Sequence, residues 1–154
     1  MIKLVRLDYR LLHGQVCFTW VQHVSAHRVI VDDDSANDDL KKSALKLAKP
    51  QGVRLNVFTL EQILAKMPKV QQLKENIIII FGNVHDLATF AKTHPEIAEI
   101  NYGATANRSG ATQTDQSVFL LPSEIEDTRE ILAAGVKIYS QQTPGHARTN
   151  ITSI

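Results

Sequence analysis

The sequence has little of several features that would direct a chain to other protein classes. It contains one cysteine, Cys17, so no internal disulfide can form, which fits a reducing compartment better than an oxidising one. Its densest apolar run, Ile77 to Phe81, is far too short to span a bilayer, and the first ten residues lack the apolar region of a signal peptide. We therefore expect a soluble, cytoplasmic protein.

The sequence also lacks an excess of charge of either sign. Its 17 lysines and arginines are balanced by 16 aspartates and glutamates, and a formal net charge of +1 argues against broad electrostatic attachment to nucleic acid or anionic lipid. The nucleotide-binding patterns G-x-G-x-x-G and G-x-x-x-x-G-K-[ST] are absent as well. These absences exclude a broad charged binding surface and the common nucleotide-binding loops, but they are compatible with a small local binding site.

The length and the apolar content of the chain are sufficient for one hydrophobic core. A chain of 154 residues with 44% apolar and 21% charged residues has the size and composition of a single globular domain. No shift in composition marks a boundary along the chain. We expect residues 1–154 to form one domain.

Short apolar runs alternate with longer amphipathic ones along the whole chain. The segments expected to be strands are MIKLVRL, RVIVD, VRLNVF, NIIIIF, EINY, SVFLL and VKIYSQ. The segments expected to be helices are 14–24, the residues before Pro50, 59–66, 86–92 and 122–134. This alternation is typical of βαβ units and predicts an α/β fold with a mostly parallel central sheet and helices on both faces.

Two of these helices carry specific signals. In the helix before Pro50, four apolar residues are expected to form the stripe that faces the core: Leu40, Ala44, Leu47 and Ala48. Thr59 and Gln62 match the capping box of the next helix, which is expected to end near Lys66.

The most informative stretch is RLDYRLLHGQV, residues 6–16, because it follows the first expected strand and leads into the first helix. Loops at the carboxyl ends of strands hold the ligands of open α/β sheets. The usual helix cap is replaced by His13 and Gly14, so the first N–H groups of the helix are free to bind an anion, and Gly14 lets the backbone come close. Arg6 and Arg10 add forked donors that suit phosphate oxygens.

A phosphoryl group is the anion that this loop suits best. An uncharged imidazole is a nucleophile, so His13 can accept a phosphoryl group, and Asp8 or another carboxylate can orient its tautomer. Phosphoryl transfer requires in-line placement and positive charge around the equatorial oxygens. The alternative is that His13 is a hydrogen-bonded structural residue and that Arg6 and Arg10 only close salt bridges.

Other candidate sites are weaker. The acidic run from Asp32 to Asp39 suggests a magnesium site or a phosphoaspartate receiver, but the third strand ends at Thr59 without the acceptor aspartate of a receiver. We interpret the run as a loop and helix start, with Asp33 expected to face the site. His23 and His27 are four residues apart, but the helix is expected to end near Ser25, so no metal site is predicted.

The site loop, followed by VIVDDDSANDDLKKSALKLAKPQGV, resembles the IIB component of the mannose/fructose/sorbose family of the bacterial sugar phosphotransferase system. The resemblance continues through Asn101 and Gly103 to LAAGVKIYSQQTP near the end of the chain. It implies an α/β fold and a protein-N(pi)-phosphohistidine–sugar phosphotransferase activity that uses neither a metal nor an organic cofactor.

The resemblance also implies roles and partners. His13, through its Nδ1 nitrogen, would accept a phosphoryl group from a IIA phosphohistidine and pass it to a sugar imported through the membrane IIC and IID components. Arg10 and the neighbouring backbone amides would stabilise the phosphoryl group, with Asp8 and Gln15 in the same loop. The protein would be cytoplasmic and peripherally associated with the permease components. A homodimer is a hypothesis drawn from the family alone.

Two segments depart from the family pattern. After Asn101 the chain reads YGATANRSGATQT, which keeps Arg108 and Gly110 but loses the basic residues that relatives carry, so whether 101–115 closes the site is open. After the fourth strand it reads GNVHDL, without the basic residue and proline that relatives often have. Partner contacts or the transported sugar can therefore differ.

Two other functions stay open from sequence. One is a non-catalytic α/β module that binds an anion or small ligand, and the other is a divergent IIB paralogue that acts in regulation. Tyr9, Leu11 and Leu12 are either an exposed docking surface beside His13 or, for the two leucines, buried anchors of the loop.

Overall fold

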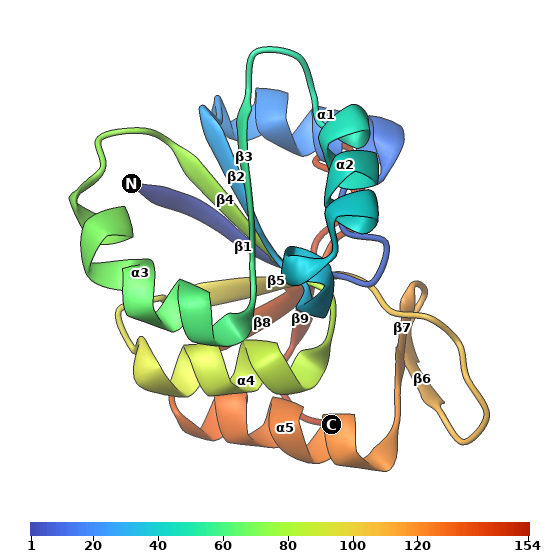
Figure 1. The fold of residues 1–154 in the computed structure, drawn as a ribbon. Coiled ribbons are helices and arrows are strands. Elements are labelled where there is room, and N and C mark those ends of the chain that lie inside the picture. The colour runs from blue at the N-terminus through green and yellow to red at the C-terminus, as the bar shows by residue number, and fades with distance from the viewer.

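The computed structural model describes the backbone of residues 1–154 and every side chain other than that of Ser35 (Figure 1). The strands are β1 (Ile2–Asp8), β2 (Arg28–Asp32), β3 (Arg54–Phe58), β4 (Ile77–Phe81), β5 (Glu99–Ala104), β6 (Thr112–Asp115), β7 (Val118–Leu120), β8 (Lys137–Ser140) and β9 (Thr149–Ile151). The helices are α1 (Gly14–Val24), the 3₁₀ turn η1 (Asp34–Asn37), α2 (Asp39–Ala48), α3 (Leu60–Gln72), α4 (Val84–Thr93) and α5 (Pro122–Ala133).

Seven strands form one sheet in the order β3-β2-β4-β1-β5-β8-β9, and β6 pairs with β7 in a separate hairpin. Every pair in the main sheet is parallel except β8 with β9. The predicted α/β class and mostly parallel sheet are therefore confirmed. Strand β4 is buried along its whole length, as its unbroken apolar sequence requires of a central strand covered on both faces.

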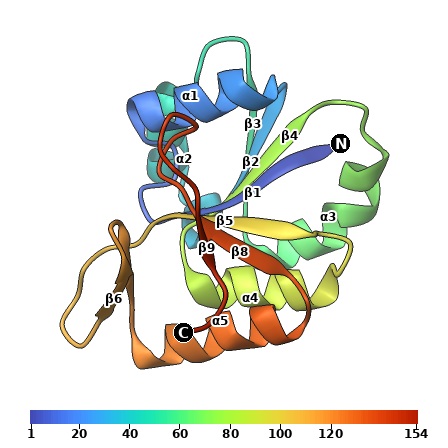
Figure 2. The same cartoon turned by 180° about the vertical axis from the view of Figure 1, so that it is seen from behind.

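Helices cover both faces of the sheet, as Figures 1 and 2 show from opposite sides. On one face, α3, α4 and α5 pack on Val5, Leu7 and the other strand residues that point their way. On the other face, Cys17, Trp20 and Val21 of α1 pack on the alternate strand residues. The period-two alternation of β1 thus divides its side chains between two cores.

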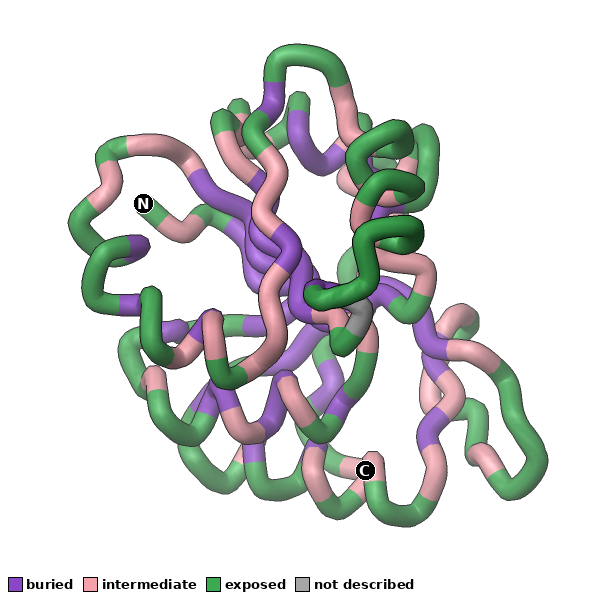
Figure 3. The backbone as a smooth tube through the Cα atoms, in the orientation of Figure 1, coloured by how far each residue is buried: buried purple, intermediate pink, exposed green. Residues whose placement is uncertain are grey.

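The predicted inward stripe of α2 is wrong in orientation. No residue of α2 is buried, Leu40 and Leu47 are 82% and 89% exposed, and the helix is exposed along most of its length in Figure 3. Only Leu45 packs against the α1-side core. Amphipathic spacing marks an apolar face but does not say which neighbour covers it.

Other boundaries also differ from the prediction. Helix α3 continues to Gln72 through Pro68, because Met67 and Val70 bury their side chains in the core. Asn83 caps α4 by accepting from the Asp86 N–H, so the helix begins at Val84 instead of Asp86. The short strands β6 and β9 were not predicted; their sequences are polar and mostly exposed.

Candidate functional site

The loop after β1 leaves the sheet at a topological switch point. Strand β1 lies between β4 and β5, and the helix that follows β1 covers the opposite face from the helix that follows β4. Such adjacent strands open a crevice at their carboxyl ends, which is where open α/β sheets bind ligands. Residues 9–13 form the loop at this crevice, between β1 and α1.

Asp8 organises this loop from a buried position. Its Oδ1 accepts hydrogen bonds from the backbone N and the Nε of Arg10, each at 3.0 Å, and its Oδ2 accepts from Arg10 Nη2 at 3.1 Å. The bonded pair is bidentate, which fixes the direction of the guanidinium. The contacts of the Asp8 carboxylate are thus to arginines, and no bond to the His13 imidazole is found in the described part of the chain, so Asp8 orients Arg10 and not the imidazole.

Arg10 keeps one end of its guanidinium for another partner. Its side chain is about one-fifth exposed. Its Nε and Nη2 are bonded to Asp8, while Nη1 has no hydrogen-bond partner among the residues that the structure describes. A guanidinium held this way can present two N–H groups to an anion without first losing side-chain freedom.

Arg6 does not have the predicted role of a direct phosphate donor. It is 2% exposed, and its Nη1 donates to Asn101 Oδ1 and to the Gln141 carbonyl. Its Nη2 donates to Asp8 Oδ2 and to the Gln142 carbonyl. Burial lowers the pKa of Arg6, and the Asp8 charge opposes that effect. With both amino groups already bonded, Arg6 is a structural cation that joins β1 to the segment after β8.

The close approach of Arg6 to the backbone explains the glycine at position 103. A Cβ on Gly103 would lie closer to the Arg6 guanidinium than real Cβ contacts allow. Gly103 is also the extra residue where the register of β1 and β5 shifts between Leu7 and Asp8. Asn101 and Gly103 therefore serve the same purpose, which is to seat Arg6.

His13 occupies the start of α1 as its N-cap residue, without a side-chain cap hydrogen bond. His13, Gly14 and Gln15 are all exposed. Gly14 has a φ of +42°, which favours glycine, and a Cβ there would meet nothing within 4 Å. The N–H groups of Gly14 and Gln15 have no hydrogen-bond partner among the described residues, which leaves an open, donor-rich helix start.

The apolar residues of the loop divide between the two predicted roles. Tyr9 is 50% exposed, whereas Leu12 is buried in the α1-side core. Leu11 has a φ of 59° and packs beside Gly82, the residue after β4. A leucine at positive φ is strained, so its packing at the crevice holds the loop in this conformation. Leu12 is therefore a loop anchor, and Tyr9 is the exposed apolar residue.

The acidic residues after β2 differ in their surroundings. The backbone N–H of Asp33 donates to the Phe58 carbonyl, and the role of Asp33 at the site stays a prediction. Asp32 is 1% exposed, and its carboxyl oxygens have no hydrogen-bond partner among the described residues. Burial, together with repulsion from Asp86 and Asp34, raises the pKa of Asp32 to about 9.

The segment between β5 and α5 forms the wall on the other side of the loop. Thr105 is fixed by a hydrogen bond of its N–H to the Ser117 carbonyl, and Arg108 donates to both carboxylate oxygens of Glu124. The β6–β7 hairpin extends away from the main sheet here, as Figures 1 and 2 show. Arg108 is thus committed to a structural ion pair.

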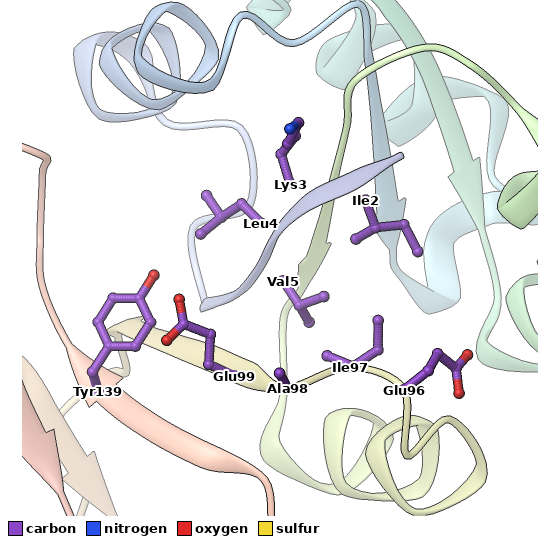
Figure 4. Close-up of a pocket in the computed structure, with 9 residues that line it drawn as sticks. All are labelled: Ile2, Lys3, Leu4, Val5, Glu96, Ile97, Ala98, Glu99 and Tyr139. Atoms are coloured by element: carbon purple, nitrogen blue, oxygen red, sulfur yellow. The ribbon is translucent and has the colours of Figure 1, made fainter.

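A separate hollow of about 240 Å³ lies at the other end of the sheet (Figure 4). It exists because β1 pairs with β5 only from Arg6 onward, so Ile2 to Val5 lie apart from the start of β5. In the described residues no cluster of three or more histidines, cysteines, aspartates or glutamates suits a metal ion, and no helix is both long and apolar enough to cross a membrane. The carboxyl-end loop is thus the candidate site.

The sequence pattern predicts the site loop, but it does not predict the distant residues that hold Arg6 in place. The carbonyls of Gln141 and Gln142, which bind Arg6, lie about 135 residues away in sequence. They belong to the stretch LAAGVKIYSQQTP, which carries part of the family resemblance but for which no site role was predicted. Trp20 Nε1 also donates to the Gln142 carbonyl at 3.1 Å. Cys17 lies in the core as expected, and burial raises the pKa of its thiol to about 11.

Known proteins resemble this chain in both sequence and fold. The family model of the "PTS system sorbose subfamily IIB component" matches residues 2–154. The sorbose-specific EIIB component of Klebsiella pneumoniae is 37% identical over 138 residues, which cover 89% of this chain and 84% of that protein. The mannose-specific EIIAB component of Escherichia coli strain K12 is 29% identical over 90% of this chain, but the match covers only 43% of that longer protein.

Solved structures that resemble this chain are also of IIB components. The crystal structure of the IIBSor domain of the Klebsiella pneumoniae sorbose permease matches with a TM-score of 0.90 and 35% identity, over 99% of this chain and 94% of that one. The N-acetylgalactosamine-specific IIB component 1 of Escherichia coli also matches with a TM-score of 0.90, at 26% identity, over 98% of this chain and 99% of that one. The chain therefore belongs to the sorbose subfamily of IIB components, the phosphocarriers of the sugar phosphotransferase system.

Proposed function

We propose that His13 is the residue that carries the phosphoryl group, which it receives from a IIA phosphohistidine and passes to a sugar held by membrane IIC and IID components. The observation that carries this proposal is the exposed His13 at an uncapped helix start, on the same loop as a guanidinium that Asp8 holds in place. The transfer needs positive charge and positioned donors, and the loop supplies both.

In the first step, a ring nitrogen lone pair of His13 forms a bond to phosphorus as the phosphorus–nitrogen bond of the IIA phosphohistidine breaks. In the second step, a sugar hydroxyl oxygen forms a bond to phosphorus as the bond to His13 breaks. The bonding electron pair returns to the ring nitrogen, and the hydroxyl proton passes to solvent water. We assign Nδ1 as the reacting nitrogen from the family resemblance. Arg10 Nη1 and the N–H groups of Gly14 and Gln15 would bind the phosphoryl oxygens in both steps.

Asp8 is the positioning residue in this mechanism. Three hydrogen bonds to Asp8 fix the backbone and the guanidinium of Arg10. The Arg10 side chain is therefore already ordered when the phosphoryl group binds, and less conformational entropy is lost at that step. Arg6 neutralises the Asp8 carboxylate through a buried ion pair. Arg6, Asp8 and Arg10 together therefore carry one positive charge at the loop.

The test is to incubate the chain with phosphorylated IIA and the general phosphotransferase proteins and to map any acid-labile modification. We expect one phosphoryl group on His13, none on the His13→Ala variant, and unchanged labelling of His85→Ala, in which an exposed histidine on α4 is removed. Labelling of the His13→Ala variant at another histidine would overturn the assignment.

A further inference from the structure

A hollow of about 220 Å³ opens beside Arg10, and Phe119 of the β6–β7 hairpin is among its lining residues. It is smaller than the pockets of about 300–1,000 Å³ that hold drug-sized ligands, so its size suits one small molecule such as a monosaccharide. Its lining residues include two aromatic rings, one cation and two amide side chains: Tyr9, Phe119, Arg10, Asn107 and Gln142.

The walls of this hollow are fixed by hydrogen bonds before any ligand binds. The Tyr9 N–H donates to the Ala104 carbonyl at 3.1 Å. Thr105 Oγ1 donates to the Phe119 carbonyl and accepts from the Phe119 N–H, each at 2.6 Å. The third wall is the Gln142 backbone, whose carbonyl is held by Arg6 and Trp20. Pre-formed walls reduce the ordering cost of binding.

Thr105 and Ser117 use their hydroxyl groups in hydrogen bonds within the fold, whereas three other polar side chains that line the hollow keep unused groups. The amide groups of Asn107 and Gln142, and Nη1 of Arg10, have no hydrogen-bond partners among the described side chains and backbone. A sugar hydroxyl both donates and accepts, and a primary amide offers two donors and an acceptor oxygen, so the two groups are complementary. Tyr9 and Phe119 add apolar ring surface of the kind that packs against the C–H groups of a sugar ring.

We infer that this hollow is a half-site for the acceptor monosaccharide and that Asn107 and Gln142 select it through its hydroxyl groups. The inference rests on the proposed phosphocarrier function and adds to it a specificity-determining surface on this chain. Arg10 lies at the border of the hollow and can contact the phosphoryl group while the sugar hydroxyls occupy the amide side. The product of the transfer, a sugar phosphate, is the ligand that would fill both parts.

The test compares the binding of three probes to the intact chain by NMR: inorganic phosphate, an aldohexose 6-phosphate and a ketohexose 1-phosphate. The readout is the ratio between the dissociation constant of inorganic phosphate and that of each hexose phosphate. Because two added hydrogen bonds amount to about a tenfold gain in affinity, we expect at least one hexose phosphate to bind about tenfold more tightly than inorganic phosphate. Its binding should shift the side-chain amide signals of Asn107 and Gln142.

The double variant Asn107→Ala/Gln142→Ala should lose this ratio, to within about twofold of unity, whereas Gln51→Ala, an exposed amide on a distant turn, should keep it. Equal ratios in the wild type and the double variant would overturn the half-site. Amide signals that stay unshifted in a wild-type chain that still becomes phosphorylated on His13 would overturn only the half-site. Failure of His13 to become phosphorylated would instead overturn the carrier function on which it rests.

Discussion

At the scale of single residues, the site depends on a division of labour between two arginines that the sequence alone presents as equals. Both flank Asp8, and both suit phosphate oxygens in principle. Burial separates them, because Arg6 has used its amino groups on Asp8, Asn101 and two carbonyls, whereas Arg10 retains Nη1. No local pattern distinguishes the two roles, since the groups that consume Arg6 come from distant parts of the chain.

Replacing Arg10 should therefore mainly slow phosphorylation, whereas replacing Arg6 should mainly lower the unfolding free energy. Arg10→Ala should slow phosphoryl acceptance by about 10²–10³-fold, since it removes a positioned charge, and should cost about 1–3 kcal/mol of unfolding free energy because Asp8 keeps Arg6. Arg6→Met should cost about 3–5 kcal/mol because it leaves Asp8 and buried acceptors without their cation. Denaturant unfolding and single-turnover phosphorylation measure the two effects. Equal losses of stability would make Arg10 a structural residue.

Gly103 gives a second test at this scale. Gly103→Ala should lower the unfolding free energy by about 1–3 kcal/mol or more, because the added Cβ forces the Arg6 guanidinium out of its seat. Gly145→Ala is the matched control, since its Cβ would meet only Thr143 Oγ1 at 3.8 Å, and it should change stability by less than about 0.5 kcal/mol. A tolerated alanine at 103 would show that Arg6 is not held as described.

At the scale of the elements, the sequence predicts what is local and misses what depends on neighbours. The buried run of β4 and the Thr59 capping box are confirmed, because each is set by residues close in sequence. The outward stripe of α2, the polar strands β6 and β9 and the passage of α3 through Pro68 are set by the packing of distant segments. The site loop follows the same rule, since its donors are local and its supports are not.

The exposure of α2 can be tested directly. Leu47→Ala should change the unfolding free energy by less than about 0.5 kcal/mol, because the side chain is 89% exposed. Ile78→Ala, in the α1-side core and 1% exposed, should cost about 2–5 kcal/mol. A comparable loss for Leu47→Ala in thermal or denaturant unfolding would mean that the stripe faces the core after all.

The end of β2 should give the protein a distinct pH dependence. With a pKa of about 9 in the folded chain and an ordinary value near 4 in the unfolded one, Asp32 binds an extra proton only in the folded state between these pH values. The unfolding free energy should therefore fall as pH rises from about 4 to about 9, by at most about 1.4 kcal/mol per pH unit from this group.

Asp32→Asn should remove this contribution, so the variant should gain stability relative to the wild type as pH rises through the window. Unfolding by denaturant at several pH values from 4 to 9 measures the difference. Parallel stability curves for the two proteins would show that the Asp32 carboxyl is not protonated in the folded chain.

At the scale of the whole molecule, the topology brings the working parts together. The order of strands places β1 beside β4, and the helices that follow these two strands lie on opposite faces, which opens the crevice that the loop occupies. The α/β class followed from the alternation of segments, but the strand order did not, because it depends on which strands meet across the sheet. The segment after β8 then returns to cover Arg6 and complete the support.

The most direct test of the central claim, that His13 is the relay, is a single-turnover chase. The chain is loaded with radioactive phosphate from IIA, purified, and mixed with membranes that contain the IIC and IID components and a sugar. The account predicts that label leaves His13 at the rate at which sugar phosphate appears, and that the His13→Ala chain supports neither step. Sugar phosphate formed with the His13→Ala chain, or label that stays on His13 while sugar phosphate accumulates, would contradict it.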